Sequence, residues 1–233
     1  LSKISTGLSV SWSNSYPLIE DGEEMLIKHI TKRGTTFPFF VDYALAGNTV
    51  SYYYLNGFYR YSFSTVFASA TDGSLLGVNN GFRYEGAISS AIQLSGNSFA
   101  LTYFFRGKNF YLHNHSFNTS ATTSIENLGG IQLTDLVTDA AVKATRMKIN
   151  GSDVLIFASN SNLNRIVLNV FDAATGSLLN KYEINQAAQT ELGAIAPTAD
   201  NGLVITGKTM VFGKFPRIFV LKIPSSKIVG EQE

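Results

Sequence analysis

The sequence predicts an all-β protein built as a β-propeller of four-stranded antiparallel blades. The first observation is a half-buried strand core that recurs at steps of 49, 55 and 50 residues. A marker in the following strand recurs independently at steps of 50, 54 and 52 residues. Repeats of roughly 40–50 residues made of strands are typical of propeller blades. The first set is Val50, Phe99, Val154 and Val204, and the second set is Phe67, Phe117, Phe171 and Ile223.

Composition supports the same fold class. Hydrophobic residues make up 45% of the 233 residues, with 17 Phe and 11 Tyr, and charged residues only 15%. Aromatic and β-branched residues favour strands, and low charge with high hydrophobicity argues against disorder. The segments 154–157, 166–171 and 218–223 are apolar at nearly every position, as expected of strands covered on both faces by neighbouring blades.

Each repeat is expected to hold two hairpins. Asp200-Asn201-Gly202 predicts a tight turn, because Asn and Gly tolerate positive φ. Asn56-Gly57 predicts a type I′ turn between strands 52–55 and 58–63. The corresponding links in the later repeats are 106–109, 160–164 and the longer 208–216. Variable loops between constant strands are expected along one rim of a ring.

The ends of the chain do not complete a whole number of repeats. Residues 1–12 resemble a third strand, a turn and a fourth strand, with Ile4 matching Ile223, and 17–37 carry an insertion. Residues 227–230 predict a short fourth strand after the last marker. We therefore expect one domain, 1–233, with about four and a half repeats, either as a four- or five-bladed ring or as part of a larger one. The repeats are 1–36 (partial, with the insertion), 37–85, 86–138, 139–189 and 190–233.

The fourth repeat resembles a known family. Residues 196–207, followed by 218–223, resemble the Asp-Gly-Gly-type repeat of β-propellers among surface lipoproteins of Bacteroidota, and residues 1–16 look like the next stretch of that repeat. Asn201 replaces the first Gly of the pattern and Pro224 the usual Asp. The resemblance implies a propeller at the cell surface or outer membrane, with a lipid-anchored Cys upstream of Leu1, and implies no catalytic residues.

Several function classes have little support. A net charge of +1 and the absence of a basic stripe argue against nucleic acid as a partner. The chain contains no Cys, which excludes disulfides and thiolate chemistry within it. No apolar run reaches the ~18–20 residues of a membrane-spanning helix. No cofactor motif is present, and carboxylates such as Asp42 mostly lie at predicted turns.

His113 and His115 form the one weak metal candidate. Side chains alternate along a strand, so His113-Asn114-His115 should place both imidazoles on one face. A zinc site needs three or four ligands, and no third ligand is evident, so we expect no metal site.

The hairpin at 52–61 is the most aromatic part of the chain. Aromatic rings with a polar edge suit sugars, peptides and protein interfaces, although half of these rings should be core between blades. We therefore expect a non-enzymatic binding or scaffold propeller that engages a protein or glycan partner. The alternative is a glycan-active enzyme with carboxylates gathered at a central funnel. The candidate contact residues are Tyr52, Tyr54, Phe58, Tyr59, Tyr61 and Phe212.

Overall fold

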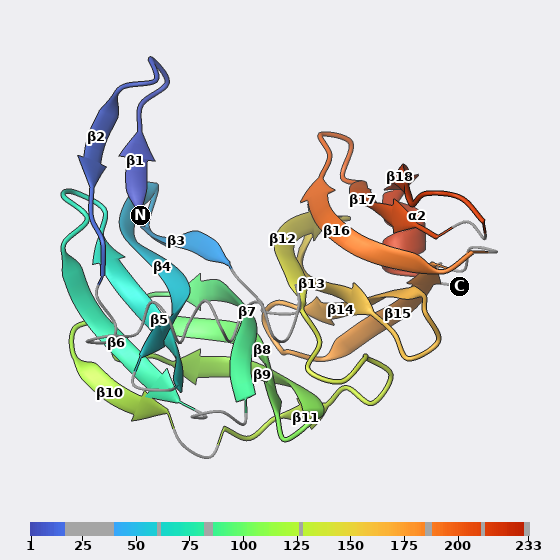
Figure 1. Ribbon diagram of the computed structural model, residues 1–233, viewed down its shortest axis with the longest axis horizontal. Helices are drawn as coiled ribbons and strands as arrows, with labels where there is room; N and C mark the ends of the chain where they lie inside the picture. Colours follow the sequence, from blue (N-terminus) through green and yellow to red (C-terminus); the bar gives the residue numbers. More distant parts are fainter. Residues whose placement is uncertain are drawn as a thin grey trace.

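In the computed structural model, strands make up most of the chain, in several small sheets (Figure 1). The structure describes residues 1–16, 40–59, 62–81, 86–125, 128–184, 188–210 and 213–230. Five strands form sheet I, in the order β10-β6-β5-β4-β3. Their bounds are β3 Val41–Ala46, β4 Thr49–Tyr59, β5 Ser62–Ser69, β6 Leu75–Gly81 and β10 Thr122–Ile125.

Three further sheets follow along the chain. Sheet II has the order β11-β9-β8-β7, sheet III β12-β13-β14-β15 and sheet IV β16-β17-β18. The bounds in sheet II are β7 Gly86–Ser95, β8 Ser98–Phe105, β9 Lys108–Ser116 and β11 Ile131–Gln132. In sheet III they are β12 Lys143–Ile149, β13 Ser152–Asn160, β14 Ile166–Asp172 and β15 Leu178–Ile184. In sheet IV they are β16 Thr190–Pro197, β17 Leu203–Thr209 and β18 Arg217–Ile223.

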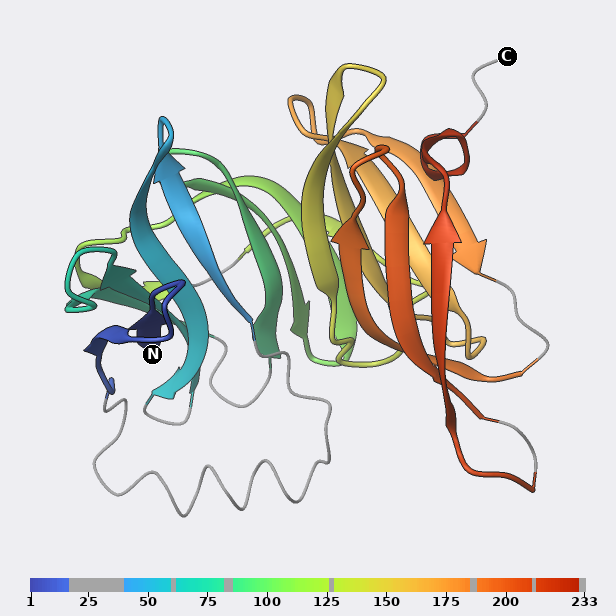
Figure 2. The ribbon, with the colours of Figure 1, turned by 90° about the horizontal axis from the view of Figure 1, so that it is seen from above.

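The four sheets are stacked one against the next around an arc, like successive blades (Figures 1 and 2). Three apolar clusters fill the spaces between sheets I and II, II and III, and III and IV, and they contain Phe99, Phe157 and Ile166 respectively. The first strand of each sheet lies nearest the centre, where β3 contacts β7, β7 contacts β12, and β12 contacts β16. This arrangement is propeller-like, and the described sheets do not close into a ring.

Only sheet III matches the expected blade of four full-length, consecutive antiparallel strands. Sheet IV has three described strands, and the fourth strand of sheet II, β11, has two residues. β10, the strand that follows β9 along the chain, lies in the preceding sheet and runs parallel to β6, with Thr122 opposite Val78. Gly77 allows this close approach, since a Cβ there would lie 2.7 Å from the backbone nitrogen of Ala121.

Two local expectations are wrong. Asn56-Gly57 is not a turn, because β4 runs through it and pairs with β5 from Tyr52 opposite Ser69 to Tyr59 opposite Ser62. Residues 227–230 do not form a strand. A short helix, α2 (Ser225–Ile228), follows β18, and its Ile228 is fully buried in the cluster between sheets III and IV.

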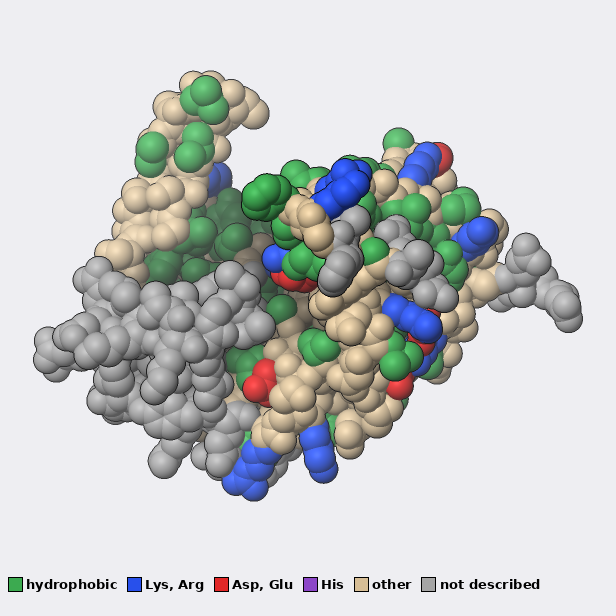
Figure 3. Space-filling model, turned by 45° about the vertical axis from the view of Figure 1, so that its right-hand side comes forward, with side chains coloured by type: hydrophobic (Ala, Val, Ile, Leu, Met, Phe, Trp, Pro, Cys, Tyr) green, Lys and Arg blue, Asp and Glu red, His purple; other side chains and the backbone are tan. Residues whose placement is uncertain are grey.

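The N-terminal residues form a separate hairpin, β1 (Ser2–Ile4) and β2 (Val10–Ser13), as the strand-turn-strand pattern predicts. It is attached to the β5–β6 turn of sheet I: the Asn14 side chain donates a hydrogen bond to the Asp72 carbonyl at 2.7 Å. Trp12 packs edge-on against Tyr53 at 5.7 Å between ring centroids. Beside this hairpin the surface is hollowed, and hydrophobic side chains lie at the floor of the hollow (Figure 3).

Candidate functional site

The first strands of the four sheets line a groove at the centre of the arc. The larger part of this groove has a volume of about 680 Å³ and is lined by β3, β7 and β12. A smaller part, of about 320 Å³, is lined in addition by residues 193–195 of β16. Asp42 and Ala144 line both parts. Much of the lining is small, as at Ala46, Gly47 and Ser95. We call the two parts together the central groove.

Asp42 is the one carboxylate among the described residues that line this groove. It lies opposite Tyr54 in the β3–β4 ladder, and its carboxylate accepts a hydrogen bond from the Tyr43 backbone N–H at 2.8 Å. Solvent reaches the side chain, yet the surrounding protein at the groove floor raises the pKa of the Asp42 carboxyl above its ordinary value, because desolvation disfavours the charged form. Hydrogen bonds from Tyr43 and Tyr54 act in the opposite direction and only partly offset this effect. The sequence had suggested that this Asp belongs to a turn, and the structure places it inside a strand.

Gln93 and Arg146 hold the first strands together at one end of the groove. The Gln93 side-chain oxygen accepts the Leu45 N–H at 2.6 Å, and its amide nitrogen donates to the Leu45 carbonyl at 3.1 Å. Arg146 donates to the Gln93 and Leu94 carbonyls at 3.4 and 3.3 Å and pairs with Asp153 at 2.6 Å. These bonds connect β3, β7 and β12 without a backbone ladder, so side chains set the width of the groove here.

Two asparagines, of which Asn56 is buried, perform a similar task at the other end of the groove. Asn56 accepts the Phe40 N–H at 2.9 Å and donates to the Ile88 carbonyl at 2.8 Å, which joins sheet I to β7. Asn160, at the equivalent place six residues after Val154, accepts the Leu192 N–H of β16 at 2.8 Å. The equal spacing of these two asparagines after the repeat marker is the sequence signal that could have identified them.

Of the six predicted contact residues, the structure describes the side chains of two, Tyr52 and Tyr54, and neither is exposed. Tyr52 and Tyr54 are buried in the cluster between sheets I and II, and the Tyr54 ring meets Phe99 edge-on at 5.0 Å. Burial raises the pKa of Tyr52 to about 12 and also raises that of Tyr54. The side chains of Phe58 and Tyr59, and the whole of Tyr61 and Phe212, lie outside the described residues. Tyr52 and Tyr54 therefore belong to the core, and of these two only Tyr54 also borders the central groove.

The two histidines of β9 point to opposite faces of sheet II. Asn114 has a φ of 63°, and the β8–β9 register shifts between Phe99 and Leu101, which marks a bulge. His113 lies beside Tyr111, whose hydroxyl is 3.2 Å from its Nδ1, on the sheet III side. His115 packs against Phe117 at 4.7 Å on the sheet I side. The expectation of a shared face is wrong, and no group of three metal-ligating side chains occurs in the described ranges.

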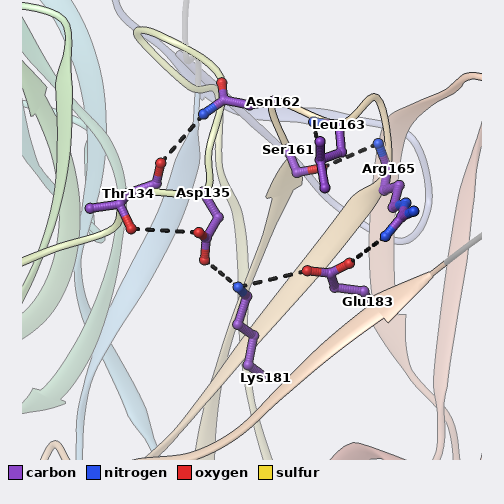
Figure 4. Close-up of polar contacts among 8 residues, drawn as sticks. All are labelled: Thr134, Asp135, Ser161, Asn162, Leu163, Arg165, Lys181 and Glu183. Atoms are coloured by element: carbon purple, nitrogen blue, oxygen red, sulfur yellow. Dashed lines mark hydrogen bonds and ion pairs between the residues drawn. The ribbon is translucent and has the colours of Figure 1, made fainter.

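A second polar cluster lies on the surface near sheet III (Figure 4). Lys181 of β15 pairs with Asp135 of the link between sheets II and III and lies 3.7 Å from Glu183, which pairs with Arg165 at 3.0 Å. The hydrogen bond to Asp135 raises the pKa of Lys181. These side chains are a third to a half exposed, and the cluster fastens the link to the sheet rather than enclosing a cavity.

The comparisons with known proteins leave the family open. No family model matches the chain, and no curated protein matches it. Among solved structures, the chain is similar to one described as "Structure of Dos1 propeller", with 18% identity and a TM-score of 0.43. That match covers 74% of this chain and 42% of the other, so this chain spans less than half of that structure. Of the described helices, none has the length and apolar character needed to cross a membrane.

Proposed function

We propose that the protein is a non-enzymatic binding module and that the central groove takes a short glycan. The supporting observation is the groove itself, a concavity between four strands that carries an ionisable carboxylate, Asp42, and small neutral side chains. Its volume lies within the roughly 300–1,000 Å³ of ordinary ligand pockets. A folded protein partner would need roughly 800 Å² of surface, which a groove of this size does not offer.

The chemistry of the lining suits sugar hydroxyls. The Asp42 carboxylate accepts hydrogen bonds, and the Tyr43 side chain is half exposed beside it. An aromatic ring with a polar tip packs against the C–H face of a sugar while it binds a hydroxyl. Arg146 adds donors at the opposite wall, where its guanidinium already pairs with Asp153.

Binding is favoured over hydrolysis because Asp42 is the one carboxylate among the described residues that line the groove. Glycoside hydrolysis ordinarily uses two carboxyl groups, about 5–9.5 Å apart. Incubation of the protein with each bound oligosaccharide should leave the sugar intact by mass spectrometry. Release of shorter products by the wild-type protein, absent for Asp42→Asn, would support the enzymatic alternative.

The binding proposal is tested on an array of immobilised oligosaccharides with labelled protein. Asp42→Asn and Tyr43→Ala should each lower the signal for the bound glycans at least about tenfold, since each removes a direct contact. Asp200→Asn is the matched control, because Asp200 lies at an exposed turn of sheet IV and pairs with Lys222 there. Equal signals for all four proteins, or no signal for any glycan, would refute the proposal.

A cell-surface or outer-membrane location belongs to the same proposal and is supported by the repeat resemblance of residues 196–207. Protease treatment of intact source cells should then degrade the protein while a cytoplasmic marker survives. Survival of both proteins until the cells are lysed would contradict this location.

A further inference from the structure

The outer edge of β18 is a strand position that no described strand occupies. In sheet III the third strand, β14, lies between β13 and β15. Its counterpart β18 pairs with β17, and no strand within the described ranges pairs with its other edge. We propose that this edge binds an extended strand from a partner polypeptide, in the position that β15 occupies in sheet III. This proposal is independent of the central groove.

The two sheets can be compared residue by residue. Val154 pairs with Asp172 in sheet III, and Val204, 50 residues later, pairs with Lys222 in sheet IV. Each residue of β18 therefore corresponds to the residue of β14 that precedes it by 50, and the match of Ile223 with Phe171 that the sequence markers gave is two residues out of register. Ile218 and Val220 correspond to Leu168 and Val170, which are fully buried against the next sheet. In sheet IV the same positions are 86% and 69% exposed.

The chain that follows β18 is held elsewhere. Pro224 begins helix α2 directly after the strand. The side-chain nitrogen of Asn180, on β15, donates to the Ile228 carbonyl at 2.9 Å, and the Ile228 side chain is buried against sheet III. Because these contacts turn the chain toward sheet III, residues 224–230 do not return along β18 as a fourth strand. A seven-residue edge strand with five apolar side chains, which no described strand pairs with, is a favourable template for another strand.

The charges indicate what kind of strand fits. In sheet III, Glu183 of β15 lies opposite Val167, whose counterpart in β18 is Arg217. Arg217 is exposed and forms no ion pair with any described residue. An antiparallel strand of the β15 type would therefore place a carboxylate opposite Arg217 and an aromatic residue opposite Ile218, as Tyr182 lies opposite Leu168.

A second copy of the chain is a poorer occupant. The sequence of β18, Arg-Ile-Phe-Val-Leu-Lys-Ile, contains no acidic residue. Two β18 edges paired with each other would offer no carboxylate to Arg217, because β18 itself has none and Asp200 already pairs with Lys222. The partner is therefore inferred to be a different strand, with apolar side chains at alternate positions and an acidic one opposite Arg217.

The test uses a fluorescent peptide with the sequence of residues 177–185, Ser-Leu-Leu-Asn-Lys-Tyr-Glu-Ile-Asn, added to the whole protein. Fluorescence anisotropy should show saturable binding. Arg217→Glu in the protein should weaken it about three- to tenfold, as expected for reversing a cross-strand ion pair. A peptide with Lys in place of its Glu should lose affinity for the wild-type protein and regain it with Arg217→Glu.

Two controls separate edge pairing from general attraction. Lys148→Glu makes the same change in net charge at an exposed position of β12 and should leave the affinity unchanged. A peptide with Pro in place of its Asn at position 180 should not bind, because Pro removes a ladder donor.

Three results would overturn the proposal. The first is the absence of saturable binding up to the solubility of the peptide. The second is binding that neither Arg217→Glu nor the Pro peptide weakens. The third is a dimer in sedimentation velocity that the peptide dissociates, which would make the occupant a second copy. Loss of glycan binding has no bearing on any of these readouts.

Discussion

A matched pair of valines measures how much a covering sheet contributes to stability. Val170 of β14 and Val220 of β18 occupy equivalent positions on equivalent strands, but Val170 is fully buried by sheet IV and Val220 is 69% exposed. Val→Ala removes the equivalent of two methylene groups, each worth about 0.8 kcal/mol when buried. The transfer loss at Val170 is therefore about 1.6 kcal/mol, and the cavity left behind raises the expected cost to about 2–3 kcal/mol.

The same substitution at Val220 should cost at most about 0.5 kcal/mol, because the side chain is largely in water in the native state. Urea unfolding should show a lower midpoint for Val170→Ala with an unchanged slope, and a midpoint close to wild type for Val220→Ala. Equal losses at the two positions would refute the argument, because they would mean that the outward face of sheet IV is covered in solution.

Three further predictions concern single positions. Gly176→Ala should lower the free energy of unfolding by about 2–3 kcal/mol, since the added Cβ would lie 2.5 Å from the His113 ring. Gly151 has a similar positive φ but open space around it, so Gly151→Ala should lower the free energy of unfolding by only about 1–2 kcal/mol. Urea unfolding measures both values. The pKa of Tyr52 is raised from 10.0 to about 12, so its burial stabilises the fold fully below pH 10, and this contribution is lost as the pH rises toward 12. Tyr52→Phe should flatten that alkaline decline, and an unchanged pH profile would contradict the assignment. Lys181→Gln should lower the free energy of unfolding by less than about 1 kcal/mol in low salt and by nothing measurable in 1 M NaCl. A loss of stability that persists in high salt would mean that packing, and not charge, holds this side chain in place.

The repeat markers predicted the sheets because a strand core must be apolar wherever a sheet is covered on both faces. Phe99 and Val154 are buried between sheets, as this reasoning requires. Local turn chemistry was less reliable. Asn56-Gly57 has the composition of a hairpin turn, but the Asn side chain satisfies two backbone groups of other strands, and this tertiary bonding outweighs the turn preference.

The candidate site was harder to predict for two physical reasons. A bulge changes which face a side chain occupies, so the left-handed conformation of Asn114 separates His113 from His115 although simple alternation pairs them. The central groove is assembled from different sheets, and Asp42 and Arg146 approach it from strands about 100 residues apart in sequence. Neither residue belongs to the repeated pattern, so periodicity carries no information about them.

The repeated sheets bury one another, and the surfaces available for binding lie where this burial is interrupted. Where the pattern continues, one sheet buries the next, as sheet IV buries Val170. At β18 no described strand covers the same face and edge, because Pro224 and Ile228 turn residues 224–230 toward sheet III. The polar residues of the groove lie on first strands, which have a sheet neighbour on one edge only. Both proposed binding surfaces therefore lie at strand edges that no described strand pairs with.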